Sequence, residues 1–207
     1  MKVYVALTFD DGYLSHYRIA KILHDEGING TFFIITHLQY FENKPLLTLR
    51  PEIIQVISDM GHEIGSHTCS HPNLTKLPCQ HIEYELKVSK RFLEGLIRKK
   101  VLSFAYPGGF HNKDVLPHVA RYYKCARLAG KRFEAKTWNA QLKSRYLIEG
   151  IGYKELLKLP MKYMLYRCIR PVIVFHDDPP HMVKAVIKYL RFWGAKFLTL
   201  GELFEEI

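Results

Sequence analysis

Short apolar runs alternate with amphipathic segments along most of the chain. The runs are rich in β-branched and aromatic residues and have the length of ordinary strands. They predict seven strands, at Val3–Phe9, Gly30–Ile35, Glu63–Ser66, Ser103–Tyr106, Cys125–Leu128, Val172–Phe175 and Lys196–Leu200.

The segments between these runs carry apolar residues at helical spacing. Tyr13–Glu26 is one such segment, and it ends at Gly27, a residue type that commonly terminates helices. Proline is favoured in the first turn of a helix, so several of the remaining starts are marked by proline. The further predicted helices begin at Pro51, Pro78, Asn112 and Pro180, and the last runs through Met182–Trp193 to Gly194.

Strands that alternate with helices favour a parallel sheet with helices on its outside, closed into a barrel or left open. Seven strands in 207 residues fit a barrel of the smallest practical size. Because the chain has no internal repeat, low-complexity tract or linker, we predict a single domain over residues 1–207. His37–Arg50 and Gly130–Gly150 lack clear periodicity and are either substrate loops or surface segments.

Composition narrows the classes of partner. The chain is 48% hydrophobic, which allows a substantial core, and its net charge is +10, with 24 of its 30 Lys and Arg residues in the segment 87–207. Such asymmetry is compatible with an acidic partner or with a solvated, lysine-rich surface. The basic residues are dispersed and no nucleic-acid-binding module is recognisable, so we expect no nucleic-acid partner.

The N-terminal residues and the cysteines bear on localisation. We interpret Met1–Phe9 as a strand and not as a targeting segment, because an acidic pair follows at once. No apolar run approaches the roughly 20 residues that a membrane span requires. We therefore expect a soluble, cytoplasmic protein without a membrane partner, with reduced thiols at its four cysteines, Cys69, Cys79, Cys125 and Cys168.

Three polar clusters follow predicted strands. Asp10 and Asp11 follow the first strand, and adjacent carboxylates repel each other unless a cation or a division of roles separates their charges. An Asp-Gly turn in which Asp11 caps the next helix is the alternative. His67 and His71 follow the third strand, and their i, i+4 spacing places both imidazoles on one side of a helical turn, where they can bind one ion.

The third cluster is His176-Asp177-Asp178, at the end of an apolar strand. An imidazole there can act as a general acid or base near neutral pH, or it can have a structural role. None of the three clusters is decisive alone. All three, however, stand at the carboxyl ends of strands in one βα pattern, the edge at which such folds assemble their sites.

Four motifs in order resemble those of the polysaccharide deacetylases, carbohydrate esterase family 4. The resemblance spans roughly residues 3 to 200, and the combination in this order is specific. The motifs are Thr8-Phe9-Asp10-Asp11-Gly12, His67-x-x-x-His71 within Gly61–His71, Tyr106-Pro107-Gly108-Gly109 and Val174-Phe175-His176-Asp177.

The resemblance implies a distorted (β/α) barrel with fewer than eight strands, in keeping with our prediction of about seven parallel strands. It implies that Asp10 is the general base and that His176 protonates the leaving amine. It also implies that Asp11, His67 and His71 bind a single divalent metal, for which zinc is our first choice and cobalt, nickel or manganese are alternatives.

The resemblance further predicts residues that contact substrate. Gly108 lies at the position of the family's main-chain oxyanion donor, and Val174 replaces a more usual leucine that shapes the pocket for the acetyl methyl group. Trp138 matches the family's tryptophan motif only in part. The predicted substrate-binding residues are Tyr106, Pro107, Gly108, Trp138 and Val174.

The chain departs from the family pattern at Ala105. The family usually has an arginine at this position, two residues before the proline, where it pairs with the base carboxylate. Without that cation the pKa of Asp10 would rise. We hypothesise that Arg127, on a later predicted strand, supplies the charge instead, with Lys131 as a second candidate.

The activity implied is removal of the N-acetyl group from a small or oligomeric N-acetylated amino sugar, of the chitin-oligomer, peptidoglycan-fragment or glycan-precursor type. One alternative is the same metal-dependent hydrolysis of another non-peptide linear or cyclic amide. Another is a non-catalytic carbohydrate-binding relative, in which Ala105 records lost catalysis. The intact set of metal ligands favours an enzyme. The oligomeric state has no signal in the sequence.

Overall fold

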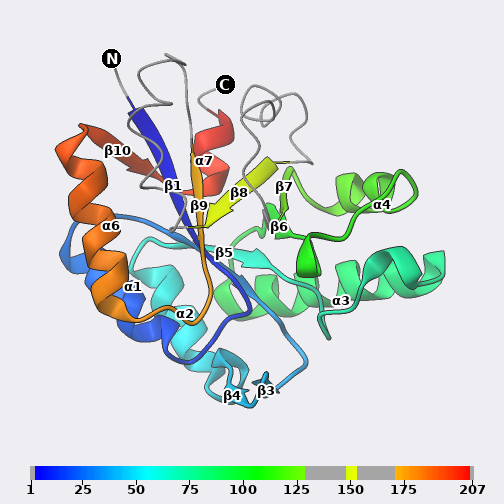
Figure 1. The fold of residues 1–207 in the computed structure, drawn as a ribbon. Helices are drawn as coiled ribbons and strands as arrows, with labels where there is room; N and C mark the ends of the chain where they lie inside the picture. Colours follow the sequence, from blue (N-terminus) through cyan, green and yellow to red (C-terminus); the bar gives the residue numbers. More distant parts are fainter. Residues whose placement is uncertain (1–2, 129–147, 153–170, 206–207) are drawn as a thin grey trace.

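The computed structural model describes residues 3–128, 148–152 and 171–205, in which a curved parallel sheet is surrounded by helices (Figure 1). The sheet has eight strands in the order β10-β1-β2-β5-β6-β7-β8-β9, and β9 pairs with β1 as well. Their bounds are β1 Val3–Phe9, β2 Thr31–Ile34, β5 Glu63–Ser66, β6 Ser103–Ala105, β7 Cys125–Leu128, β8 Ile148–Gly152, β9 Val172–Phe175 and β10 Ala195–Leu198.

The pairing of β1 with β9 closes seven strands into a ring. The eighth, β10, lies along Val3–Ala6 of β1, and β2 pairs with Thr8 and Phe9 further along the same strand. All the described pairings in this sheet are parallel, so the carboxyl ends of the strands meet at one end of the barrel. The prediction of a distorted (β/α) barrel is confirmed.

The membership of the ring differs from our prediction although the number agrees. The seven predicted strands are all present, but β10 stands outside the ring. The seventh strand of the ring is β8, which we did not predict. We missed β8 because Gly150 and Gly152 interrupt its apolar pattern. We also missed a short antiparallel hairpin, β3 Tyr40–Phe41 with β4 Lys44–Pro45, inside the segment without periodicity.

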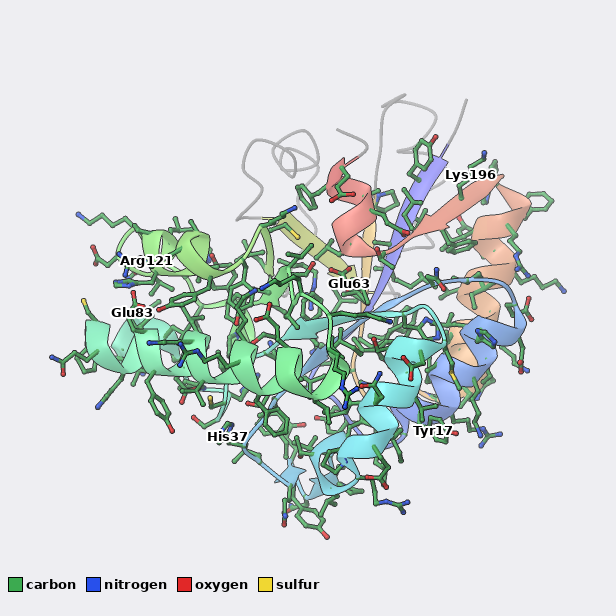
Figure 2. All side chains as sticks on the ribbon, turned by 180° about the vertical axis from the view of Figure 1, so that it is seen from behind. Tyr17, His37, Glu63, Glu83, Arg121 and Lys196 are labelled. Carbon is green, nitrogen blue, oxygen red and sulfur yellow. The ribbon has the colours of Figure 1, made fainter. Side chains whose placement is uncertain are left out.

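Helices cover the outside of the barrel, as the alternating pattern predicts. Their apolar faces pack on the sheet, as in α1, where Ile19, Ala20 and Leu23 are buried. Figure 2 shows Glu83 and Arg121, which form an ion pair between the neighbouring helices α3 and α4. The described helices are α1 His16–Asp25, α2 Pro51–Asp59, α3 Cys79–Ile97, α4 Val115–Tyr122, α6 Pro180–Phe192 and α7 Leu200–Glu205.

Alternation along β1 separates two layers of the core. Val5, Leu7 and Phe9 belong to the large cluster that includes the buried residues of α1, whereas Ala6 belongs to a smaller cluster with Phe33. Since successive strand residues point to opposite faces, the second set faces the barrel interior. The other buried members of this interior cluster are Ala105, Cys125, Val172, Leu200 and Leu203.

The barrel is closed at the end where its strands begin. Leu200 and Leu203 of α7 pack into the interior cluster, and Glu63 at the start of β5 accepts hydrogen bonds from the Gly201 N–H and the Thr31 hydroxyl, each at 2.9 Å. Figure 2 shows Glu63 next to α7. The opposite end, where the strands finish, is left for a site. Among the described helices, none combines the length and apolar character needed to cross a membrane.

Candidate active site

The polar clusters at the carboxyl ends of β1, β5 and β9 converge on one cavity of about 410 Å³. Side chains separated by more than 160 positions in the sequence therefore share one pocket, as the parallel topology predicted. The residues that line it are Asp10, Asp11, Tyr13, Phe41, Glu42, Lys44, His67, His71, Gly108, His176, Asp177 and Asp178.

Asp11, His67 and His71 form a compact set of three ligand atoms. Asp11 Oδ1 lies 3.3 Å from His67 Nε2 and 3.5 Å from His71 Nε2, and the three atoms all lie within 4.8 Å of one another. His67 Nδ1 donates a hydrogen bond to the Ala105 carbonyl at 2.8 Å, which leaves the Nε2 lone pair directed at the other two groups. The donor set thus fits one divalent ion.

The histidine segment is a loop and not the helical turn that we expected from the i, i+4 spacing. Thr68 and His71 have φ values of 68° and 58°, in the left-handed region that helices of L-residues do not enter. Asp11 has a φ of 70° as well. Backbone conformations of this kind are costly and persist only where the surroundings enforce them, which is common at functional sites.

Glu85 on α3 supplies part of that enforcement. Its carboxylate accepts hydrogen bonds from the Cys69 N–H at 2.7 Å, from the Ser70 N–H at 3.1 Å and from the Ser70 hydroxyl at 2.7 Å. Within the loop, the Thr68 hydroxyl accepts from the His71 N–H at 3.0 Å. A buried carboxylate on a long helix therefore holds the loop that carries both histidines.

Asp10 forms an ion pair with Arg127, and both side chains are buried. Arg127 is the register partner of Ala105 on the neighbouring strand, so both residues face the barrel interior at the same level. A Cβ on Gly150 would approach Arg127 Nη1 to 3.1 Å. A small residue on each side of β7 thus leaves room for the guanidinium. Lys131, our second candidate, lies outside the described residues.

The charges of the site set its protonation. Burial raises the pKa of Asp10, but the positive charges of Arg127, His67 and His176 together outweigh burial, so the pKa is lowered overall. Burial likewise opposes ionisation of Asp11, yet its hydrogen bond and attraction to His67 bring the pKa of Asp11 to about 2. Burial, together with the charge of His67, lowers the pKa of His71 to about 4. Both carboxylates are therefore ionised at neutral pH and His71 is neutral.

The pKa of His67 is shifted in the direction opposite to that of His71. Burial lowers its pKa, but the hydrogen bond to Asp11 and the negative charges of Asp10 and Asp11 prevail and raise the pKa overall. In the absence of an ion, a proton on His67 therefore neutralises part of the carboxylate charge. A divalent cation would take over that role, because it binds the neutral imidazole.

His176 follows β9 and lies next to Asp10 in the pocket. Its Nε2 atom lies 3.8 Å from Asp10 Oδ2, and its side chain is 55% exposed. The imidazole thus faces the same carboxylate that Arg127 contacts from within the barrel. A half-exposed imidazole next to a buried carboxylate can exchange protons with a bound substrate.

The predicted substrate-binding residues are placed unevenly. Gly108 lines the cavity. Its φ of 59° is left-handed, and a Cβ at this position would lie 2.8 Å from the Phe110 ring, so the position favours glycine. Tyr106, Pro107 and Val174 are buried and are not among its lining residues. Trp138 lies outside the residues that the structure describes.

Sequence reasoning missed one wall of the pocket. The hairpin β3–β4 contributes Phe41, Glu42 and Lys44, and the Phe41 ring packs against His71 with a centroid distance of 4.5 Å. Tyr13, directly after the first motif, also lines the cavity. The only signal was the absence of periodicity in His37–Arg50, which we had named as a candidate substrate loop.

Comparisons with known proteins identify the family of the chain. The sequence model of the polysaccharide deacetylase family matches residues 2–124. The chain is 34% identical over 120 residues to the peptidoglycan-N-acetylmuramic acid deacetylase PdaA of Bacillus subtilis, a match that covers 56% of this chain and 43% of that protein. It is 27% identical over 207 residues to a peptidoglycan-N-acetylglucosamine deacetylase of Bacillus cereus, covering 96% of this chain and 87% of that protein.

Solved structures share the fold. A pseudoenzyme of carbohydrate esterase family 4 from Bacillus anthracis superposes with a TM-score of 0.70 at 19% identity, over 98% of this chain and 65% of that chain. At this level of identity the likeness concerns the fold alone. The family model, by contrast, covers more than half of the chain and includes the motifs that supply Asp10, Asp11, His67 and His71. The chain therefore belongs to the polysaccharide deacetylase family.

Proposed function

We propose that this protein is a metal-dependent deacetylase that hydrolyses the N-acetyl group of an amino sugar. The observation that carries the proposal is the convergence, in one cavity, of a three-ligand set with a paired carboxylate and an imidazole. The two Bacillus deacetylases named above act on N-acetylated sugars of peptidoglycan, which supports the same substrate class here.

Asp11, His67 and His71 would hold one divalent ion. Zinc suits two imidazoles and a carboxylate, and cobalt, nickel and manganese suit them as well. When bound, such an ion lowers the pKa of water and polarises the amide carbonyl. The hydrogen bond from His67 to the Ala105 carbonyl keeps the ligand atom of that imidazole directed at the site.

Asp10 is proposed to accept the proton of the attacking water. Arg127 keeps this carboxylate ionised, so the base is available at neutral pH without a preceding deprotonation. The buried ion pair also limits rotation of the carboxylate. The arginine of this chain, although it comes from β7, would then serve the purpose that the family arginine serves from the position of Ala105.

His176 is proposed to donate a proton to the leaving nitrogen, because an amide expels its amine only when the nitrogen is protonated. Its half-exposed position allows it to reach substrate that enters the cavity. Main-chain N–H groups near Gly108 are proposed to stabilise the oxyanion that develops on the acetyl oxygen.

The first experiment is acetate release from N-acetylglucosamine oligomers by metal-loaded protein. Asp10→Asn should abolish release and retain metal, whereas His67→Ala should lose both metal and release. His81→Ala, which removes an exposed histidine at the start of α3, is the matched control and should retain both. Release that persists in Asp10→Asn would refute the assigned base. Metal binding without acetate release on any acetylated sugar would indicate another amide as substrate.

A further inference from the structure

The segment after β9 is held by polar contacts on both sides of His176. The main-chain N–H of His176 donates a hydrogen bond to Asp178 Oδ2 at 2.9 Å. The main-chain carbonyl of His176 accepts one from His16 Nε2 at 2.7 Å. Both main-chain polar groups of His176 are thereby engaged. The direction in which the imidazole leaves the backbone is consequently set by neighbouring groups and not by the strand alone.

His16 acts as a fixed donor in this arrangement. Its ring is buried against Phe9, Tyr13 and Phe32, and its Nε2 atom faces a carbonyl, so Nε2 must carry the hydrogen. Its Nδ1 atom has no hydrogen-bond partner among the described residues. Burial outweighs the hydrogen bond to His176 and lowers the pKa of His16, so the ring stays neutral.

Asp177 connects the segment to two other elements. One carboxylate oxygen accepts a hydrogen bond from the Ser15 hydroxyl, at the start of α1, at 2.5 Å. The other pairs with Lys44 Nζ, on β4 of the hairpin, at 3.0 Å. The carboxylate therefore joins the segment that carries His176 to the first helix and to the wall of the pocket.

These contacts are placed where they contribute little to folding. The Lys44 and Asp177 side chains are 47% and 28% exposed, and ion pairs that water can reach contribute little to stability. Their effect on position is larger, because a displacement of about 1 Å in a reacting group can reduce a rate on the order of 100-fold. The contacts thus suit a role in positioning.

We propose that Asp177 is a positioning residue for His176, anchored by Ser15 and Lys44. The carboxylate holds the segment so that the imidazole faces Asp10 and the cavity. This inference rests on the proposed function, in which His176 protonates the leaving amine. His16 supplies the second anchor, through the main-chain carbonyl of His176.

The test compares kcat and KM for acetate release in variants that remove one contact at a time. Asp177→Ala should lower kcat by about 10–100-fold and leave KM and metal content unchanged. Ser15→Ala and Lys44→Met should each have a smaller effect of the same kind. Lys44→Arg should restore the wild-type rate. Adding Lys44→Met to Asp177→Ala should cause no further loss, because the two residues act through one contact.

Glu26→Gln is the matched control. It removes a carboxylate from another exposed ion pair, with Arg191, outside the pocket, and it should leave kcat unchanged. A rise in KM at constant kcat in Asp177→Ala would overturn the proposal, because Asp177 would then contact substrate directly. An unchanged kcat would overturn it as well.

A second readout does not depend on turnover. The ring signal of His176, identified in ¹³C-histidine-labelled protein through its loss in His176→Gln, should shift in Asp177→Ala and stay unchanged in Glu26→Gln. If the wild-type protein releases no acetate, the proposed function fails, and this signal still tests the positioning. An unshifted signal in Asp177→Ala would refute the role of Asp177 regardless of activity.

Discussion

The two sides of the pocket are held in different ways. On the metal-ligand side, Asp11 and His71 have left-handed φ values. Two buried residues hold this side: Glu85 binds the loop that carries the histidines, and Arg127 pairs with Asp10. On the acid side, His176, Asp177 and the hairpin β3–β4 are linked by contacts that reach solvent.

The difference shows where the geometry of each side originates. Buried polar groups are expensive to leave unpaired, so the metal-ligand side is coupled to the stability of the fold. Exposed contacts are compensated by water when they are lost, so the acid side can change position without unfolding the protein. Substitutions should therefore affect stability on the first side and the rate on the second.

The largest effect is expected at Arg127. Arg127→Met leaves the Asp10 carboxylate buried without its cation, which should cost about 3–5 kcal/mol in the free energy of unfolding. Because the cation is lost, the pKa of Asp10 should also rise, and acetate release should decline at the acidic end of its pH profile. Urea unfolding and the pH dependence of acetate release provide the measurements.

A transposed pair sharpens this prediction. Arg127→Ala combined with Ala105→Arg moves the cation to the register partner on β6, the position at which the family usually carries it. The double variant should recover part of the lost stability and rate relative to Arg127→Ala. If the added arginine gives no recovery, a cation at the same level of the barrel cannot replace Arg127.

The next effect is expected at Glu85. Glu85→Gln replaces an acceptor of three hydrogen bonds, so it should cost about 1–3 kcal/mol of stability and weaken metal binding about 10–100-fold. Glu83→Gln is the matched control on the same helix, because Glu83 pairs with Arg121 at the surface. It should leave metal affinity unchanged. Equal effects of the two substitutions on metal affinity would exclude a specific role for Glu85.

A smaller effect is expected at Phe41, the point at which the two sides meet. Its ring packs against His71, and an aromatic contact of this kind contributes about 0.5–1.5 kcal/mol. Phe41→Leu should therefore weaken metal binding by less than about tenfold. Tyr40→Leu, the neighbouring exposed position on β3, should have no effect. Titration with the metal in both variants checks the difference.

The smallest effect concerns pH on the acid side. Burial raises the pKa of Asp177, but the bonds from Ser15 and Lys44 lower it overall. A carboxyl group whose pKa is lowered in the folded protein stabilises the fold when the pH is above its ordinary pKa of 3.8. That contribution is lost as the pH falls through the pKa of the folded state. The difference in unfolding free energy between the wild type and Asp177→Ala should therefore shrink below about pH 4. A constant difference would contradict it.

The sequence predicted the strands that carry the motifs, because short runs rich in β-branched and aromatic residues alternate there with amphipathic segments. It failed for β8, whose two glycines weaken the apolar pattern. One of them, Gly150, makes space next to Arg127 and Val174. It also missed the hairpin β3–β4, whose turn residues Glu42 and Asn43 have φ values of 48° and 60°. Only Asn43 has a strong preference for such a turn.

The same division applies to the site. The sequence identified the polar side chains of the site because its motifs place them directly after predicted strands. These side chains are Asp10, Asp11, His67, His71 and His176. The spacing of the two histidines, however, misled us about their backbone, since an i, i+4 pair fits a loop as well as a helix. The loop is held by Glu85, 14 positions or more away in the sequence, which no local pattern reveals.

The sequence by itself determined the order of the seven predicted strands and of the helices between them, and it determined the chemical groups at the strand ends. These depend on local periodicity and on residue type, which a linear pattern records. The tertiary structure alone decided that Arg127 lies beside Asp10, that Glu85 holds the ligand loop and that Asp177 bridges α1 and the hairpin. These contacts depend on strand register and on close approach between distant segments, which only the packed barrel establishes.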